Sequence, residues 1–98
     1  IPIRKKGKLP YKTMSYKYDL EYGTAEVEIH EDALQDNWNV LIHDDLLATG
    51  GTAIAAAELI KMQNANVAGF SFVVELDFLE GSKSLSKYSE NISSLVHF

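Results

Sequence analysis

The chain has 98 residues, a formal net charge of −5 at pH 7 and no cysteine. This length suits one domain with a small core, and the absence of cysteine excludes disulfides and thiolate metal sites. The acidic balance argues against a broad surface for nucleic acid or anionic membranes. No apolar run approaches the roughly 20 residues of a membrane-spanning helix. We therefore expect neither nucleic acid nor a membrane as a partner.

The N-terminal segment, residues 1–14, is predicted to be a flexible basic loop. It is rich in lysine and arginine, including Arg4, Lys5 and Lys8. Its glycine and prolines interrupt any regular element. Residues 13–22, TMSYKYDLEY, alternate partly between apolar and polar side chains and predict an extended strand.

A second strand is predicted over residues 25–30, AEVEIH, after the turn that the preceding glycine marks. Val27 and Ile29 fall on one face of this strand, and Glu26 and Glu28 fall on the other. We expect the valine and isoleucine to be buried and the two glutamates to face solvent. The next residues are polar and predict a turn.

The remainder of the chain alternates between apolar strands and helices. VLIH, residues 40–43, is a short apolar run typical of a strand covered on both faces of its sheet. A loop follows it, and a helix is predicted from Thr52 to about Met62, with small and apolar residues at helical spacing forming one packed face: Ala53, Ala56, Ala57 and Ile60. Three further elements are predicted, namely a buried strand over 67–76, a short helix over 80–90 and a last strand over 92–98. Strand, helix and strand in this order predict a right-handed βαβ unit with parallel strands, and so the α/β class.

The informative stretch is VLIHDDLLATGGT, residues 40–52. Its strand carries two adjacent acids, Asp44 and Asp45, to the carboxyl end, where open α/β sheets bind ligands. Two glycines then lead into a helix, whose first backbone amides and dipole favour a phosphate group. Thr49 and Thr52 add hydroxyl donors. Acids beside an anion-binding loop match a sugar phosphate, with the phosphate on the loop and the ribose hydroxyls on the acids.

Each half of this pattern has a simpler interpretation. A GGT after a strand can be a tight turn with a threonine cap, and paired aspartates are common in loops. The combination of apolar strand, acids, glycines and alanine-rich helix favours a binding site. The loop lacks the lysine of a Walker A phosphate loop, and it is not a dinucleotide-binding fingerprint.

The stretch 40–52 resembles the phosphoribosyl pyrophosphate (PRPP) signature of type I phosphoribosyltransferases. Among them the chain is most similar to adenine phosphoribosyltransferases, and the similarity covers nearly its whole length. IPIRKKGKLP resembles their flexible active-site loop, LEYGTAEVEIHEDAL the hairpin that follows it, and VVELDFLEG the next strand and loop. The fold implied is type I phosphoribosyltransferase-like, with a parallel sheet core, flanking helices and a flexible β-hairpin loop.

The resemblance implies a reaction in purine salvage, in which adenine and PRPP give AMP and diphosphate with Mg²⁺ that enters with PRPP. Residues 40–62 are the implied PRPP-binding strand, loop and helix, with no direct metal ligand. Asp44 and Asp45 would bind the ribose hydroxyls. The implied 5-phosphate site comprises Ala48, Thr49, Gly50, Gly51 and Thr52.

Further roles follow from the same resemblance. Arg4, Lys5 and Lys8 would meet the diphosphate, and Glu21 of the EYG motif would act in catalysis with Tyr22 beside it. Leu76 aligns with a residue that lines the base pocket. In addition, the three histidines, His30, His43 and His97, show no ligand spacing and are interpreted as structural, with His43 hydrogen-bonded in a buried strand.

The resemblance also implies a cytoplasmic homodimer. About the first 80 residues of family members precede this segment, so residues 1–98 are expected to be the C-terminal part of one domain that lacks its N-terminal part, and this segment alone is expected to be poorly active. Two alternatives stay open. One is the same chemistry with another purine base, since most of the hood over the base lies upstream. The other is a non-catalytic regulator that keeps the fold as a PRPP sensor.

Overall fold

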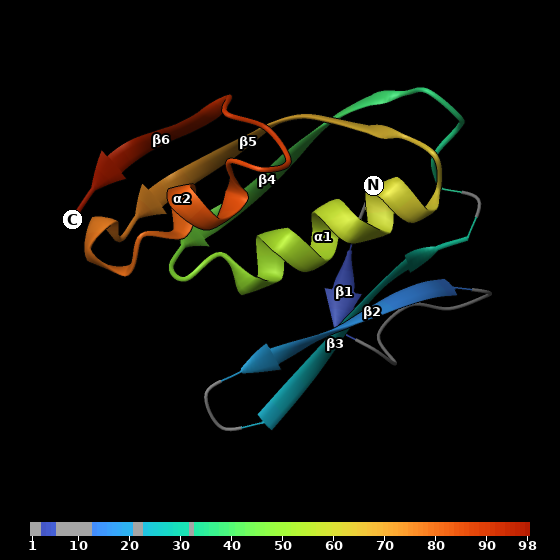
Figure 1. Ribbon diagram of the computed structural model, residues 1–98, viewed down its shortest axis with the longest axis horizontal. Helices are drawn as coiled ribbons and strands as arrows, with labels where there is room; N and C mark the ends of the chain where they lie inside the picture. Colours follow the sequence, from blue (N-terminus) through green and yellow to red (C-terminus); the bar gives the residue numbers. More distant parts are fainter. Residues whose placement is uncertain (1–2, 6–12, 21–22, 32) are drawn as a thin grey trace.

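Figure 1 shows a computed structural model in which a long helix lies between two sheets. The residues that it describes are 3–5, 13–20, 23–31 and 33–98. No helix within these ranges is long and apolar enough to cross a membrane.

The first sheet is antiparallel and contains the predicted hairpin. Strand β2 (Thr13–Leu20) pairs along its whole length with β3 (Gly23–His30), and the short β1 (Arg4–Lys5) pairs with the other edge of β3. The order is β1-β3-β2. The segment predicted as a basic loop thus contributes residues 4–5 and 13–14 to strands, and residues 6–12 lie outside the described residues.

The second sheet is parallel, as the βαβ pattern predicts. Its order is β4-β5-β6, from β4 (Asn39–Leu47), β5 (Asn66–Glu75) and β6 (Ile92–His97). Helix α1 (Gly51–Met62) connects β4 to β5. The 3₁₀ turn η1 (Asp77–Leu79) and the short helix α2 (Gly81–Leu85) lie between β5 and β6, where a single short helix was predicted.

Helix α1 packs against both sheets. The predicted face, Ala53, Ala56, Ala57 and Ile60, is buried with Phe70 and Phe72 of β5 in one apolar cluster. A second face, which the helical spacing did not single out, buries Ala55 and Leu59 against Val27 and Ile29 of β3. The predicted burial of Val27 and Ile29 is therefore confirmed. Small alanine side chains let the backbones of helix and sheet approach closely, so one helix serves as the core of two layers.

Buried Gln63 joins the end of α1 to the turn after β3. Its side-chain amide donates to the His30 carbonyl at 2.8 Å, and its side-chain oxygen accepts from the Leu34 amide at 2.9 Å. These bonds satisfy backbone groups that neither helix nor sheet can pair. They fix where the polar 33–38 connection crosses from one sheet to the other.

The prediction that residues 40–43 are covered on both sheet faces is wrong. Ile42 is buried against α1, whereas Leu41 is 58% exposed and His43 is also exposed. Within the described residues β4 is an edge strand, with α1 on one face only. The predicted hydrogen bond of His43 is nevertheless there, between its Nδ1 and the Ser71 hydroxyl oxygen, 3.4 Å apart.

The expectation that Glu28 faces solvent is also wrong. Its side chain is only 4% exposed, and it accepts a hydrogen bond from the Thr13 hydroxyl at 3.0 Å. Thr13 stands on the neighbouring strand β2, two residues before Ser15, the β2 register partner of Glu28. A hydroxyl donor offsets part of the cost of removing the carboxylate from water, so this polar position can be buried.

Candidate phosphate-binding site

The glycine-rich segment forms a bend that leads directly into α1. Gly50 is the residue before the helix and has φ 95°, a left-handed conformation that side chains disfavour. Its carbonyl accepts the first helical bond, from the Ile54 amide at 2.8 Å. Among the described residues no side chain caps this end of the helix. The amides of the first turn lack partners inside the helix, which makes this end a favourable place for an anion.

The two acids precede this bend on β4. The strand continues through both of them to Leu47, so they stand on a strand and not in the predicted loop. Both side chains are exposed. The Asp45 amide donates to the Asp44 carboxylate at 2.8 Å, which holds the Asp44 side chain against the strand. The remaining carboxylate oxygens are available to hydroxyl donors of a ligand.

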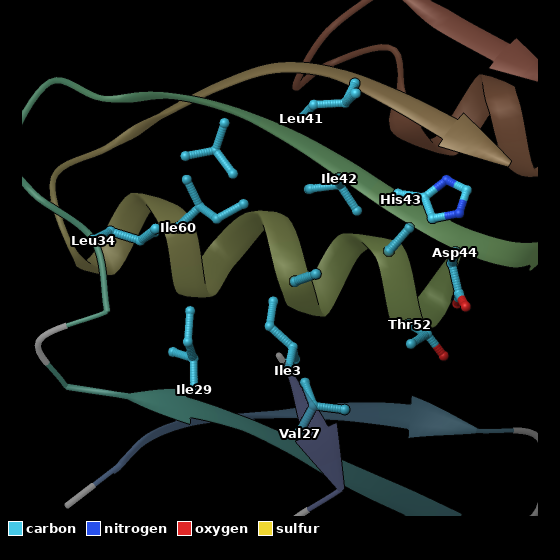
Figure 2. A pocket seen from close by; sticks show the side chains of 13 residues that line it. Ile3, Val27, Ile29, Leu34, Leu41, Ile42, His43, Asp44, Thr52 and Ile60 are labelled. Atoms are coloured by element: carbon cyan, nitrogen blue, oxygen red, sulfur yellow. The ribbon is translucent and has the colours of Figure 1, made fainter. Parts of the chain in front are cut away.

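A pocket of about 380 Å³ opens beside the acids. Figure 2 shows Asp44 and Thr52 at one end of it, with apolar side chains along the rest. It is lined by residues of β3, β4 and α1, together with Ile3 before β1 and Leu34 in the connection after β3: Ile3, Val27, Ile29, Leu34, Val40, Leu41, Ile42, His43, Asp44, Thr52, Ala53, Ala56 and Ile60. A site with a polar end and apolar walls is the usual form of a small-molecule pocket.

The structure brings several other predicted residues to this end of the parallel sheet. Ala48, Thr49 and Gly50 form the bend, and Thr49 is exposed. Leu76 follows β5 directly, and its amide donates to the Leu47 carbonyl at 2.9 Å, so it lies next to the start of the bend. Its role at a base remains a prediction.

Of the predicted catalytic and diphosphate-binding residues, the structure describes Arg4 and Lys5, on the antiparallel sheet. Arg4 and Lys5 stand on β1 opposite Glu28 and Val27 of β3. Lys8, Glu21 and Tyr22 lie outside the described residues. The register pair that closes the described hairpin joins Leu20 to Gly23. In both views this end of β2 points to the same side of the molecule as the N-terminus of α1 (Figures 1 and 2).

Four residues at this end of the parallel sheet were missed in the sequence. Glu75 is 7% exposed, and its carboxylate accepts hydrogen bonds from the hydroxyls of Ser82 and of Ser94. Gly81 is buried against the bend. The available signal was the acid within the apolar run VVEL, because a carboxylate in a buried strand needs hydrogen-bond donors from elsewhere in the fold.

Glu75 also approaches a pair of charged groups at the end of β6. The His97 Nδ1 lies 2.8 Å from an Asp77 carboxylate oxygen and 3.9 Å from one of Glu75. The hydrogen bond to Asp77 raises the pKa of His97 above its ordinary value of 6.5. These three side chains have metal-ligand chemistry, with ligand atoms within 4.8 Å of one another. The serine and histidine hydrogen bonds already account for both carboxylates, so the arrangement needs no ion.

Curated relatives match the whole chain. It is 53% identical over 98 residues to the adenine phosphoribosyltransferase of Cytophaga hutchinsonii and 55% identical to that of Nitrosococcus oceani. The chain is homologous along its whole length to adenine phosphoribosyltransferases. It spans about half of these relatives, 54% and 56% of their respective lengths. No protein-family model matches the chain.

Solved adenine phosphoribosyltransferases share the fold. The enzyme of Thermoanaerobacter pseudethanolicus superposes with a TM-score of 0.93 at 50% identity, over 99% of this chain and 55% of that one. The Saccharomyces cerevisiae enzyme, in complex with adenine and an imino-altritol bisphosphate, superposes with a TM-score of 0.86 at 43% identity, over 97% of this chain and 52% of that one. The predicted class, a parallel sheet with flanking helices of the type I phosphoribosyltransferase kind, is confirmed. The predicted roles of individual site residues stay predictions.

Proposed function

We propose that the protein carrying this chain transfers the phosphoribosyl group of PRPP to adenine, giving AMP and diphosphate. One observation carries the proposal. Two exposed acids and a glycine-rich helix start lie at the same end of a parallel sheet, and Asp44 and Thr52 from this end line a pocket. The similarity along the whole chain to adenine phosphoribosyltransferases, one of them solved with adenine bound, supports adenine as the base.

The acids and the bend bind different parts of the sugar phosphate. Asp44 and Asp45 accept hydrogen bonds from the ribose 2- and 3-hydroxyls, which orients the anomeric carbon. The 5-phosphate lies on residues 48–52, where backbone amides of the helix start and the hydroxyls of Thr49 and Thr52 donate to it. The ribose is thereby held at both ends while its glycosidic centre reacts.

Departure of diphosphate places positive charge on the ribose and negative charge on the leaving group. The basic segment bearing Arg4, Lys5 and Lys8 neutralises the negative charge of the leaving diphosphate and shields the reactive centre from water. Glu21, with Tyr22 beside it, opposes the positive charge or handles the purine proton. Leu76 contacts the base at the adjoining end of β5.

Magnesium fits this site as a companion of the substrate. The donors beside the bend are carboxylate and hydroxyl oxygens, which Mg²⁺ prefers, and it commonly keeps several waters while binding substrate phosphates. Bound to the diphosphate, it would lower the charge that builds on the leaving group. The expected setting is a cytoplasmic homodimer in purine salvage.

The test is product formation by the longest natural form of the protein, with PRPP, Mg²⁺ and adenine, guanine, hypoxanthine or xanthine in turn. AMP from adenine alone is the expected result. If only another base gives a nucleotide, that base and not adenine is the substrate, and the proposed transfer from PRPP still holds. No nucleotide from any base, together with retained PRPP binding, would identify a PRPP-sensing regulator instead.

Substitution of the acids tests the site itself. Asp44→Asn together with Asp45→Asn should lower kcat/KM for PRPP by at least about a hundredfold, since two hydroxyl-orienting carboxylates are lost. The matched control, Asp36→Asn, changes an exposed acid in the turn before β4 and should leave the kinetics unchanged. Wild-type kinetics in the double variant would rule out this ribose site.

A further inference from the structure

The start of α2 is pressed against the phosphate-binding bend. A methyl group built on Gly81 would lie 2.4 Å from the Ala48 carbonyl oxygen and 2.8 Å from the Leu47 side chain. A methyl group on Gly50 would lie 3.2 Å from the Gly81 carbonyl oxygen. The two backbones therefore touch without room for a side chain between them, and a shift of Gly81 toward the bend must displace it.

Glu75 holds the residue next to Gly81. Its carboxylate lies at the end of β5, opposite Leu47 in the sheet register. One oxygen accepts the hydrogen bond from Ser82 in the first turn of α2, and the other accepts from Ser94 of β6 at 2.8 Å. The carboxylate thus connects β6, β5 and α2 at the point where β4 enters the bend.

Burial makes this connection stiff. A carboxylate withdrawn from water is costly unless donors satisfy it, so the Glu75 oxygen that Ser82 reaches is held in its bond to that hydroxyl. Ser82 is fixed in turn, and Gly81 with it. A phosphate cradle made of backbone amides works only when those amides hold their places to within tenths of an ångström. The bend has no side-chain cap of its own among the described residues, so an external support sets its position.

We propose that Glu75 is a positioning residue for the phosphate-binding bend, acting through Ser82 and Gly81. It touches no substrate. The ligand of the bend is the 5-phosphate of PRPP, so this inference rests on the proposed function.

The first test is Ser82→Ala in the longest natural form of the protein. Loss of the hydroxyl frees the start of α2, and KM for PRPP should rise about tenfold while kcat changes by less than about twofold. Ser82→Thr keeps the hydroxyl and should restore KM. Glu75→Gln, which keeps the shape but loses one acceptor oxygen, should raise KM in the same direction if Ser82→Ala does not fold.

Ser94→Ala is the matched control. It removes the other hydroxyl that donates to the same carboxylate. Ser94 lies on β6, however, and is not part of the proposed route through Ser82 and Gly81 to the bend. We expect it to lower the unfolding temperature about as much as Ser82→Ala while KM for PRPP stays within about twofold of wild type. Equal rises of KM in both variants, or an unchanged KM in Ser82→Ala, would overturn the proposal.

A readout without catalysis separates this inference from the proposed function. Amide resonances of Gly50 and Gly51 report the position of the bend in the ligand-free protein. Relative to wild type, they should shift more in Ser82→Ala than in Ser94→Ala. Shifts in Ser82→Ala that are equal to or smaller than those in Ser94→Ala would contradict the positioning role of Glu75. If the wild-type protein makes no nucleotide, the proposed function is contradicted but the positioning role of Glu75 is not. The amide resonances would then test that role by themselves.

Discussion

Gly50 connects the backbone geometry of the bend to its chemistry. At φ 95° its amide plane turns so that the chain passes from β4 into α1 within a few residues. Alanine in this conformation costs roughly 1–2 kcal/mol. The nearby Gly81 carbonyl adds steric pressure. A glycine is therefore required here by both the backbone conformation and the neighbouring helix.

We predict that Gly50→Ala lowers the free energy of unfolding by about 1–3 kcal/mol and weakens PRPP binding, because the backbone leaves the left-handed region. Urea unfolding and PRPP titration measure the two effects. Asn64 provides the opposite substitution as a control, since it has a positive φ of 61° and already carries a side chain. Asn64→Gly should leave stability unchanged or slightly higher, and a loss like that of Gly50→Ala would contradict the backbone explanation.

At the scale of elements, the end of the parallel sheet is held together by polar bonds as well as by its ladder. The Phe98 amide donates to the Glu75 carbonyl at 2.9 Å, and the Asp77 amide donates to the Phe98 carbonyl at 2.8 Å. His97 adds its side-chain bond to Asp77. Strand β6 is thus tied to η1 directly beside the support of the bend.

This tie should depend on pH. Because the folded pKa of His97 is raised, its contribution to stability is fully present below the ordinary pKa and is lost as the pH rises through the folded value. We expect stability, measured in urea unfolding series, to decline as the pH rises from the ordinary value of 6.5 through the raised pKa of His97. Asp77→Asn should remove this part of the slope, whereas Asp36→Asn should keep it. An unchanged slope in Asp77→Asn would show that the pair does not contribute.

For the whole molecule, α1 is the layer that joins two otherwise separate sheets (Figure 1). One of its faces packs on the parallel sheet that carries the acids and the bend. Its other face packs on the antiparallel sheet, whose strand β1 carries Arg4 and Lys5. The relative position of the two sheets among the described residues therefore depends strongly on this helix.

Leu59→Ala tests this role, because Leu59 is fully buried on the face toward β3. We expect a loss of about 2–5 kcal/mol in unfolding free energy from the cavity it leaves. We also expect kcat to fall more than PRPP affinity, because the position of one sheet relative to the other becomes less defined. Met62→Ala, at an exposed position of the same helix, should cost less than about 1 kcal/mol. Equal effects of the two substitutions would argue against the coupling.

The sequence alone determined the parts of this protein that local patterns encode. Alternation identified Val27 and Ile29 as buried, and helical spacing identified the alanine face of α1, because each depends only on the period of one element. The order of strand, helix and strand specified the parallel pairing. The acids and glycines of residues 40–52 marked the candidate site, whose residue roles stay predictions, since their chemistry is readable without coordinates.

Only the tertiary structure decided the features that join distant residues. Glu28 is buried because Thr13 on the adjacent strand donates to it, and β4 runs on through Asp44 and Asp45 because β5 pairs with it there. The support of the bend by Glu75 and Ser82 likewise needs α2 folded back onto β5. Such contacts depend on which elements meet in space, and the period of a single element carries no information about its neighbours.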